Sequence, residues 1–318
     1  MAQPFNTIFN LDKIGYASDL RSIRDTLSSL GIEKEDRHEL LKVDLTNNSE
    51  TISAINYANP DFVMHLAAES HVDRSIQGPE EFIKSNICGT FNLLEAVRNH
   101  YDKLNSKRKE NFRFLHISTD EVFGSLGDTG TFNESTRYDP RSPYSASKAS
   151  SDHIVSAWHH TFGIPTLMTN CSNNYGPWQY KEKLIPKIIY NALSNKEIPI
   201  YGNGENIRDW LFVEDHVNGL IKVLLEGKIG EKYCIGGNQE KNNNEVVNKI
   251  CELMDNIIPK EISYKALINY VEDRLGHDKR YAIDSSKMKS QLNWRPKYSF
   301  DKGLEITVLW YLEHFKKI

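Results

Sequence analysis

The segment Phe62-Val-Met-His-Leu66, which runs straight into Ala67-Ala-Glu-Ser70, is the clearest indication of how this chain folds. Its unbroken apolar character is typical of a strand that helices cover on both faces. Similar short strands are expected at 7–11, 39–43, 112–117 and 166–170, with helices near 17–30, 49–58, 79–100 and 143–162. This alternation predicts right-handed crossovers and an α/β fold with a doubly wound parallel sheet of the Rossmann type.

The regular alternation of strands and helices ends near Asn173. Turn-rich segments at 173–177 and 201–204 then surround shorter helices expected near 182–194, 214–226 and 244–255, and a last helix is expected at 300–315. We therefore expect residues 1–173 to form the sheet domain. Residues 174–318 should mainly form a smaller α/β lobe that covers it, with some segments returning to the sheet domain.

The composition argues against several classes of protein. The 318 residues carry a net charge of −4, so neither nucleic acid nor an anionic membrane surface is indicated as a partner. No apolar run approaches the roughly 20 residues of a membrane helix, and the start, MAQPFNTIFN, lacks the apolar core of a signal peptide. The four cysteines and eleven histidines show neither CxxC nor HExxH spacing, so we expect no metal site and a cytoplasmic protein.

Polar residues stand where the expected strands end, at Asp12, at Asp44 and in the segments 67–70 and 118–121. The carboxyl ends of parallel strands lie at one edge of a sheet, and ligands of such sheets bind in the crevice at that edge. We therefore expect these residues to line a single ligand-binding crevice.

The motif Tyr144-Ser-Ala-Ser-Lys148 places a phenol one helical turn before an ammonium group. The ammonium lowers the pKa of the phenol from about 10 and can hold a nicotinamide ribose, so Tyr144 can take a hydroxyl proton while hydride leaves the same carbon. The alternative is a surface pair on a helix, and Tyr298 and Lys302 repeat the spacing by chance. Tyr144 is preferred because Pro143 can open a helix at this point.

Asp120 and Glu121 add two adjacent carboxyl groups to the expected crevice. Hydride transfer alone does not need them, whereas the removal of water needs an acid and a base, and like charges at close range push one pKa up. The alternative is an ordinary turn or helix cap at the end of a strand. Together with Tyr144 and Lys148, the pair indicates an oxidoreductase site adapted to elimination.

Asp12 suits an acid that accepts hydrogen bonds from an adenine ribose, which favours NAD over its 2′-phosphate form. The glycine-rich turn that holds the pyrophosphate should precede such an acid by about 20 residues, so the first strand and helix of the sheet are expected to be missing. Gly124, Gly127 and Gly130 have a suitable spacing, but a loop-like segment follows them instead of a helix. We therefore expect weak NAD retention and little turnover from the chain as given.

Longer motifs indicate a family. They are His-Leu-Ala-Ala-Glu-Ser-His-Val-Asp-Arg-Ser at 65–75, Ser-Thr-Asp-Glu-Val-Phe-Gly at 118–124, Ser-Pro-Tyr-Ser-Ala-Ser-Lys-Ala-Ser-Ser-Asp-His at 142–153, Asn-Cys-Ser-Asn-Asn-Tyr-Gly-Pro at 170–177, Arg-Asp-Trp-Leu-Phe-Val-Glu-Asp-His at 208–216 and Gly-His-Asp-Lys-Arg-Tyr-Ala-Ile-Asp at 276–284. From about residue 8 onward the chain resembles the nucleotide-sugar 4,6-dehydratases of the extended short-chain dehydrogenase/reductase family. It departs from that family at Phe123, where a tyrosine is usual, and at Leu275, where a proline is usual.

The resemblance implies contacts to a cofactor and to a substrate. The positions that match NAD contacts are Asp12, Lys13, Asp44, Leu45, Leu66, Ala67, Ala68, Glu69, Ser70, Ser85, Tyr144, Lys148 and Asn174. The positions that match nucleotide-sugar contacts are Ser70, Thr119, Asn173, Lys183, Leu184, Tyr201, Arg208, Asn243, Arg274 and His277. Arginines suit a diphosphate, because it needs permanently charged donors.

The reaction that the resemblance implies converts dTDP-glucose to dTDP-4-keto-6-deoxyglucose and water, with NAD regenerated in each turnover. The catalytic residues would be Thr119, Asp120, Glu121, Tyr144 and Lys148. Tyr144 would take the 4-hydroxyl proton, Glu121 the C5 proton, and Asp120 would protonate the departing C6 hydroxyl. Thr119 would polarise the C4 oxygen, and Lys148 would hold the ribose.

The resemblance also implies a homodimer formed through helices near 79–100 and 143–162.

A 4-epimerase would need Tyr144 and Lys148 but not the carboxyl pair. Two alternatives stay open, namely a UDP-glucose 4,6-dehydratase and a truncated, non-catalytic paralogue that binds a nucleotide sugar or a partner chain.

Overall fold

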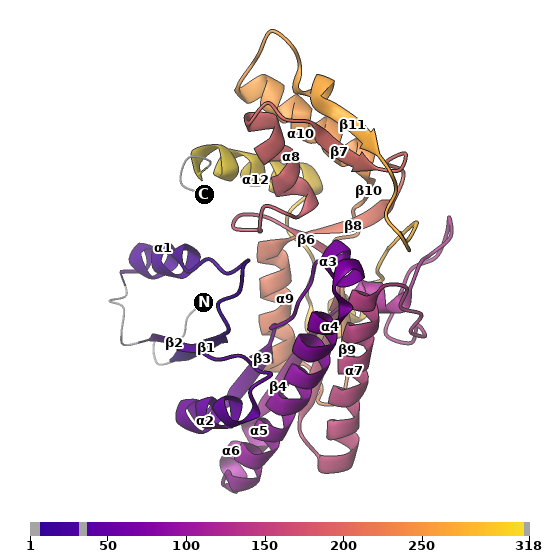
Figure 1. The fold of residues 1–318 in the computed structure, drawn as a ribbon. Helices are drawn as coiled ribbons and strands as arrows, with labels where there is room; N and C mark the ends of the chain where they lie inside the picture. Colours follow the sequence, from indigo (N-terminus) through magenta and orange to yellow (C-terminus); the bar gives the residue numbers. More distant parts are fainter. Residues whose placement is uncertain (1–6, 32–36, 315–318) are drawn as a thin grey trace.

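The computed structural model describes residues 7–31 and 37–314. Strands and helices alternate through the first half of the chain, and a smaller lobe stands over one end of the sheet (Figure 1). This α/β architecture with parallel strands confirms the predicted fold class.

The sheet domain contains two groups of parallel strands. β1 (Ile8–Asp12) pairs with β2 (His38–Lys42), and a four-stranded sheet has the order β3 (Phe62–His65), β4 (Arg113–Thr119), β5 (Thr166–Cys171), β9 (Lys232–Ile235). All five predicted strands are present, and β9 comes from the second half of the chain. Within the described residues no strand joins β1 to β3, so each has one edge without a partner strand.

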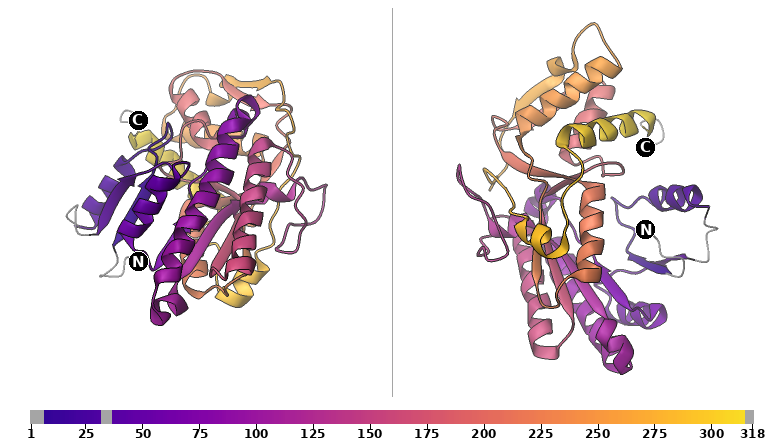
Figure 2. Two further views of the ribbon diagram at one scale, coloured as in Figure 1. Left: turned by 60° about the horizontal axis from the view of Figure 1, so that its bottom comes forward. Right: turned by 180° about the vertical axis from the view of Figure 1, so that it is seen from behind.

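Helices cover both faces of the four-stranded sheet. α5 (Gly89–Lys103) and α7 (Pro143–Phe162) lie side by side on one face, and α9 (Val213–Glu226) lies on the other (Figures 1 and 2). Side chains alternate along β4, so Phe114 joins the core with Val97 and Val155, whereas Leu115 joins the core with Leu220 of α9. β4 is therefore buried on both faces, whereas Phe62 of β3, the strand whose apolar run predicted such burial, is 44% exposed.

The helix predicted at 79–100 is interrupted. α4 (Pro79–Phe82) passes into a π-helical turn (Ile83–Cys88) before α5 begins, and such widened turns are frequent at functional sites. The helix predicted at 17–30 is α1 (Arg21–Ser29), which begins late because Asp19 accepts the backbone N–H of Arg21 at 3.0 Å. The other helices of this part are α2 (Asn48–Ala58), α3 (Val72–Gln77) and α6 (Ser106–Asn111).

The start of α7, which carries Tyr144 and Lys148, is fixed by local chemistry. The Ser142 hydroxyl accepts the backbone N–H of Ser145 at 3.0 Å, and the Ser145 hydroxyl accepts that of Ser142 at 2.9 Å, which forms a capping box. Pro143 occupies the first turn, where its missing N–H costs nothing. The helix ends at Gly163, which takes the left-handed conformation with φ +70°.

The lobe has a core of its own. β6 (Asn173–Tyr175), β8 (Ile207–Phe212) and β10 (Glu240–Asn242) form one sheet, and β7 (Ile198–Tyr201) pairs with β11 (Ile268–Val271). Around them pack α8 (Leu184–Leu193), α10 (Asn243–Ile257), the short turn η3 (Tyr264–Leu267) and α12 (Phe300–His314). α11 (Ser286–Leu292) instead packs with α9 on the four-stranded sheet.

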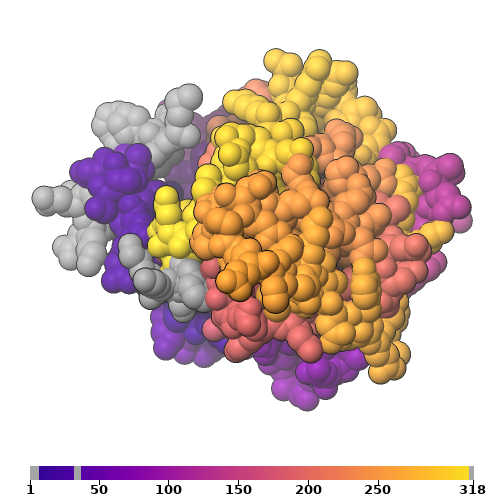
Figure 3. Space-filling view, turned by 90° about the horizontal axis from the view of Figure 1, so that it is seen from above, coloured from indigo at the N-terminus to yellow at the C-terminus, as the bar shows by residue number. Residues whose placement is uncertain are grey.

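From above, segments of the second half of the chain, coloured orange to yellow, cover the centre of the molecule, and the indigo N-terminal segments lie to one side (Figure 3). β5 ends at Cys171 and β6 of the lobe begins at Asn173, so the carboxyl end of β5 lies next to the lobe, where the predicted crevice should be.

Candidate active site

The end of β4 and the first turns of α7 bring the predicted catalytic residues together. Thr119 is the last residue of β4, and a 3-10 turn, η2 (Asp120–Phe123), follows directly. The Thr119 hydroxyl accepts the backbone N–H of Glu121 at 3.3 Å, which fixes the direction of the turn. Tyr144 lies in the first turn of α7 and Lys148 lies one turn further on, and both side chains are buried.

Asp120 and Glu121 are adjacent but lie in different electrostatic surroundings. Burial raises the pKa of Asp120 well above its ordinary value, and the negative charges of Glu121 and Asp209 raise it further. Burial also raises the pKa of Glu121, but three cationic side chains of the lobe oppose this shift: Arg208, Lys183 and Arg274. Asp120 is therefore the carboxyl that retains a proton, and Glu121 is the one that ionises more readily.

Tyr144 differs from the expectation that Lys148 lowers its pKa. The Lys148 ammonium donates to the carbonyl of Ile117 at 2.8 Å, so it is directed at the backbone of β4. Burial raises the pKa of Tyr144 well above its ordinary value and the charge of Glu121 adds to this, while the Thr119 side chain lowers it. The sequence motif does not reveal this burial, which is the reason for the difference.

The predicted NAD contact Lys13 is the centre of a cluster of polar side chains. Its ammonium forms ion pairs with Glu69 at 2.7 Å and Glu81 at 3.0 Å, and it donates to the Ser85 hydroxyl at 3.2 Å. Three of these four residues were predicted to contact the cofactor, and they come from three separate segments of the chain. The structure thus gathers them at one edge of the sheet.

Asp12 and Asp44 orient the turns that follow β1 and β2. Asp12 Oδ1 accepts the backbone N–H of Ile14 at 2.6 Å and the Ser18 hydroxyl at 3.1 Å. Asp44 Oδ1 accepts the backbone N–H of Thr46 at 2.9 Å. Next to Asp44, Leu45 packs against the core beneath α5, so its side chain anchors the turn.

The loop after β3 is held from behind by Asn86, which the sequence analysis missed. The Asn86 side chain donates to the carbonyl of Glu69 at 3.0 Å and accepts the backbone N–H of Glu69 at 2.8 Å, as a neighbouring strand would. It also donates to the Ser147 hydroxyl of α7 at 2.8 Å. The preceding residues of this loop, Leu66, Ala67 and Ala68, are exposed. The π-helical turn that directs Asn86 inward leaves no recognisable signature in the sequence.

Two observations fit the NAD that the resemblance implies. A cavity of about 330 Å³ opens beside Lys13 and Glu69. The Oδ1 atom of Asn174 is buried with no hydrogen-bond partner among the described residues, so it can accept an N–H group of a ligand.

The glycines between Gly124 and Gly130 lead into a loop, as predicted, so they do not form a phosphate-binding turn.

The lobe carries most of the predicted substrate contacts. Lys183 donates to the carbonyl of Ser70 at 2.7 Å, and so reaches the loop after β3. The guanidinium of Arg208 lies 4.2 Å from the ring centre of Tyr281 and donates to the carbonyl of Asp278 at 3.0 Å. Arg208 is buried, and its charge lowers the pKa of both Asp120 and Glu121, so it acts at the carboxyl pair.

Two further substrate candidates, Arg274 and Tyr201, bind the carboxylate of Asp73 on α3. Arg274 Nε lies 2.6 Å from Asp73 Oδ1, and the Tyr201 hydroxyl donates to Asp73 Oδ2 at 3.1 Å. His277 pairs with Asp273 at 2.7 Å. The sequence analysis missed Asp73, although it lies inside a quoted motif. The remaining substrate candidates lie at the starts of β6, α8 and α10: Asn173, Leu184 and Asn243.

The described part of the chain contains no group of three or more His, Cys, Asp or Glu side chains that could hold a metal ion. It also contains no helix long and apolar enough to cross a membrane.

Comparisons with known proteins agree with this geometry. The family model described as GDP-mannose 4,6 dehydratase matches residues 7–307. The dTDP-glucose 4,6-dehydratase of Salmonella typhimurium is 51% identical over 316 residues, which cover 96% of this chain and 86% of the relative. The chain therefore belongs to the GDP-mannose 4,6 dehydratase family.

Solved structures are similar over almost the whole chain. A dTDP-glucose 4,6-dehydratase from Bacillus anthracis in complex with NAD has a TM-score of 0.83 at 40% identity, covering 98% of this chain and 89% of that one. A dTDP-glucose 4,6-dehydratase from Streptomyces venezuelae with NAD bound has a TM-score of 0.86 at 37% identity, covering 99% and 90%.

The buried carboxyl of Asp120 should reduce stability at neutral pH. The pKa of this carboxyl is higher in the folded chain than in the unfolded chain, where it is near 3.8. As the pH rises above 3.8, the unfolded chain releases the proton more readily, so the folded chain loses stability. Asp120→Asn removes that cost, so at about pH 8 the free energy of unfolding should increase by about 1 kcal/mol or more, and the gain should shrink toward about pH 4. Urea unfolding at several pH values measures this. Asp102→Asn, on the exposed side of α5, is the control, and a gain that does not change with pH would contradict the explanation.

Proposed function

We propose that this protein is an NAD-dependent dTDP-glucose 4,6-dehydratase, a lyase that forms dTDP-4-keto-6-deoxyglucose and water. The observation that carries the proposal is the carboxyl pair Asp120 and Glu121, whose surroundings separate an acid from a base beside Tyr144 and Lys148. A 4-epimerase would not need this pair. The relatives that match nearly the whole chain are themselves dTDP-glucose 4,6-dehydratases.

We assign a role to each of these side chains. NAD, when bound, would accept the hydride from C4 and return it to C6, and its positive charge would favour the ionised phenol of Tyr144. Tyr144 takes the 4-hydroxyl proton, and Thr119 donates a hydrogen bond to the oxygen at C4. The 4-ketone acidifies the C5 proton, which Glu121 removes as a carboxylate and returns to C5 when the hydride is delivered to C6. Asp120, protonated through burial, gives its proton to the departing C6 oxygen.

We assign residues 1–173 to NAD binding and residues 174–318 mainly to the nucleotide sugar, with β9 and α11 returning to the sheet domain. The polar cluster around Lys13 supports the first assignment. The cationic side chains Lys183, Arg208 and Arg274 support the second, because a diphosphate needs such donors. The absence of basic or membrane-spanning features in the sequence supports a cytoplasmic location.

We also propose a homodimer formed through the outer faces of α5 and α7. Phe91 of α5 and Phe162 of α7 are 43% and 41% exposed, and both rings contact Trp158, at 5.8 and 5.3 Å between ring centres. The rings form a continuous aromatic strip across two adjacent helices, and such strips are typical of protein interfaces.

The carboxyl pair should act after the oxidation step. In protein loaded with NAD, Glu121→Gln and Asp120→Asn should slow water loss by about 10²–10⁴-fold while NADH still accumulates after dTDP-glucose is added. Tyr144→Phe should suppress NADH formation itself. Single-turnover absorbance together with the product mass separates the two steps. If Glu121→Gln turned over at the normal rate, another residue would be the C5 base.

Arg208 should contribute more to binding than to chemistry. Arg208→Ala removes a charged donor to the diphosphate, worth about 1.5–3 kcal/mol, so KM for dTDP-glucose should rise by about tenfold or more. The fall in kcat should be smaller than the rise in KM, because Lys183 and Arg274 still oppose the raised pKa of Glu121. Lys279→Ala, an exposed cation paired with Asp128 at 2.6 Å, is the control. Steady-state kinetics tests this, and a normal KM with a collapsed kcat would place Arg208 in the chemical step.

Breaking the aromatic strip should produce monomers. Phe91→Glu places a charge in the proposed interface, so sedimentation velocity should show a single species of half the mass of the wild type. Ile262→Glu is the control, because Ile262 is an equally apolar residue that is 70% exposed in the lobe. A wild-type protein that sediments as a monomer, or a Phe91→Glu dimer, would refute the proposed interface.

A further inference from the structure

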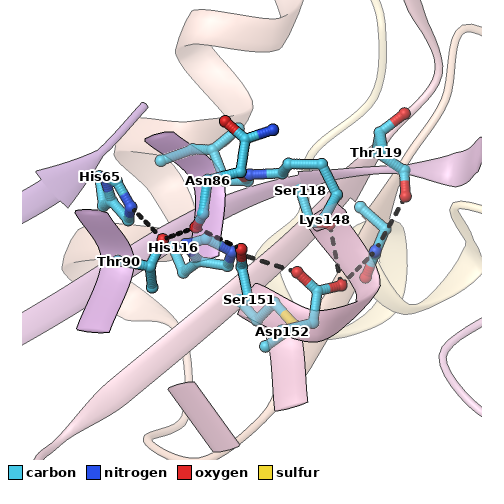
Figure 4. Close-up of polar contacts among 12 residues, drawn as sticks. His65, Asn86, Thr90, His116, Ser118, Thr119, Lys148, Ser151 and Asp152 are labelled. Atoms are coloured by element: carbon cyan, nitrogen blue, oxygen red, sulfur yellow. Dashed lines mark hydrogen bonds and ion pairs between the residues drawn. The ribbon is translucent and has the colours of Figure 1, made fainter. Parts of the chain in front are cut away.

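Asp152 lies on α7 one helical turn beyond Lys148, and it is 1% exposed. Its carboxylate accepts hydrogen bonds from the hydroxyls of Ser118 and Tyr138, both at 2.8 Å, from His116 Nε2 at 3.1 Å and, at greater length, from the Asn170 amide at 3.4 Å. These donors come from β4, from β5 and from the loop before α7. Figure 4 shows the polar side chains of β4 and α7 converging on Asp152.

These hydrogen bonds keep Asp152 ionised although it is buried. Burial alone would raise the pKa of this carboxyl, but the hydrogen bonds from His116 and Ser118 and the charge of Lys148 outweigh it, and the pKa lies below its ordinary value. Burial lowers the pKa of His116, so the imidazole is neutral and donates through Nε2. A carboxylate with each oxygen accepting hydrogen bonds is the form that matches these donors.

Lys148 and Asp152 form hydrogen bonds to neighbouring residues at the end of β4. The Lys148 ammonium donates to the carbonyl of Ile117 at 2.8 Å, and Asp152 accepts from the hydroxyl of the next residue, Ser118. The chain then continues into Thr119 and the 3-10 turn with the carboxyl pair. Both anchors therefore lie directly before the residues that must face Tyr144.

The titratable groups that face Lys148 come from four elements. They are His65 on β3, His116 on β4, Cys171 on β5, and Tyr144 and Asp152 on α7. Burial lowers the pKa of both histidines, and it raises the pKa of Cys171 to about 12 and that of Tyr144 well above its ordinary value, so these four are neutral near pH 7. Among these groups, Asp152 carries the negative charge that balances the Lys148 ammonium.

We propose that Asp152 is a positioning residue of the reaction: its carboxylate ties the end of β4 to α7 and supplies the counter-charge of Lys148. The first effect sets Thr119, Asp120 and Glu121 against Tyr144, and displacements of about 1 Å in such an arrangement can cost about 10²-fold in rate. The second effect keeps a positive charge beside the ribose-binding position. The catalytic consequence rests on the proposed function, whereas the effect on Lys148 rests only on the buried charge of Asp152 one turn away on α7.

The test uses Asp152→Asn, which keeps the shape of the side chain and removes its charge. We expect kcat to fall by about 10–100-fold with KM changed by less than about twofold. The alkaline limb of the kcat–pH profile should move to lower pH, because Lys148 without its counter-charge loses its proton more easily. Tyr138→Phe and Ser118→Ala each remove one hydrogen bond and keep the charge, so they should lower kcat less and leave the limb in place. Ser150→Ala, whose hydroxyl bonds to Ala146 within α7, is the control.

A second measurement does not depend on activity. The ¹³Cε signal of Lys148, assigned by its loss in Lys148→Met, should titrate at lower pH in Asp152→Asn than in the wild type. If the Lys148 signal titrates at the same pH in Asp152→Asn and in the wild type, the proposal is overturned whatever the activity. If the wild-type protein is inactive on dTDP-glucose, the proposed function is refuted, but the Lys148 titration still tests the role of Asp152. If Asp152→Asn does not fold, a lower kcat at constant KM in both Tyr138→Phe and Ser118→Ala supports the proposal, and an unchanged kcat in both overturns it.

Discussion

The parallel pairing of β4 with β3 and β5 is the constraint on which the candidate site depends. His116 stands in register with His65 on one side and with Met168 on the other. A slip of one residue would exchange the faces of Phe114 and Leu115, which belong to different apolar cores. Because both cores resist that exchange, β4 ends at one fixed height beneath the lobe, and Thr119 and the carboxyl pair emerge there beside α7.

Burial gives the site its chemistry, and the lobe decides how that burial acts on each group. Desolvation raises the pKa of both Asp120 and Glu121, so burial alone would leave two similar acids. At Glu121 three cations of the lobe, Arg208, Lys183 and Arg274, oppose the raised pKa and Asp278 adds to it. At Asp120 one cation, Arg208, opposes the raised pKa, and the carboxyls of Glu121 and Asp209 add to it. The lobe therefore does more than exclude water, because its charges divide the pair into a proton donor and a proton acceptor.

The sequence predicted what depends on local pattern and missed what depends on tertiary contacts. Apolar runs located the five strands to within about two residues, and the strand ends located Asp12, Asp44 and the carboxyl pair, because the edge of a parallel sheet is a geometric necessity. The π-helical turn at Asn86 and the pairing of Asp73 with Arg274 have no local pattern to reveal them. The raised pKa of Tyr144 was missed for the same reason, since it follows from burial that the motif does not encode.

The two sides of the crevice are held by interactions of very different strength. On the sheet side, Asp152 is buried among donors that satisfy it, and removing one partner of such a charge is costly, about 3–5 kcal/mol. On the lobe side, the ion pair of Asp73 with Arg274 is partly exposed, at 26% and 23% of the side chains, and such pairs contribute only about 0–1 kcal/mol. An anionic ligand that reaches Arg274 can therefore replace Asp73 at little cost. This division suits a catalyst that holds the reacting groups rigidly while it admits and releases a charged substrate.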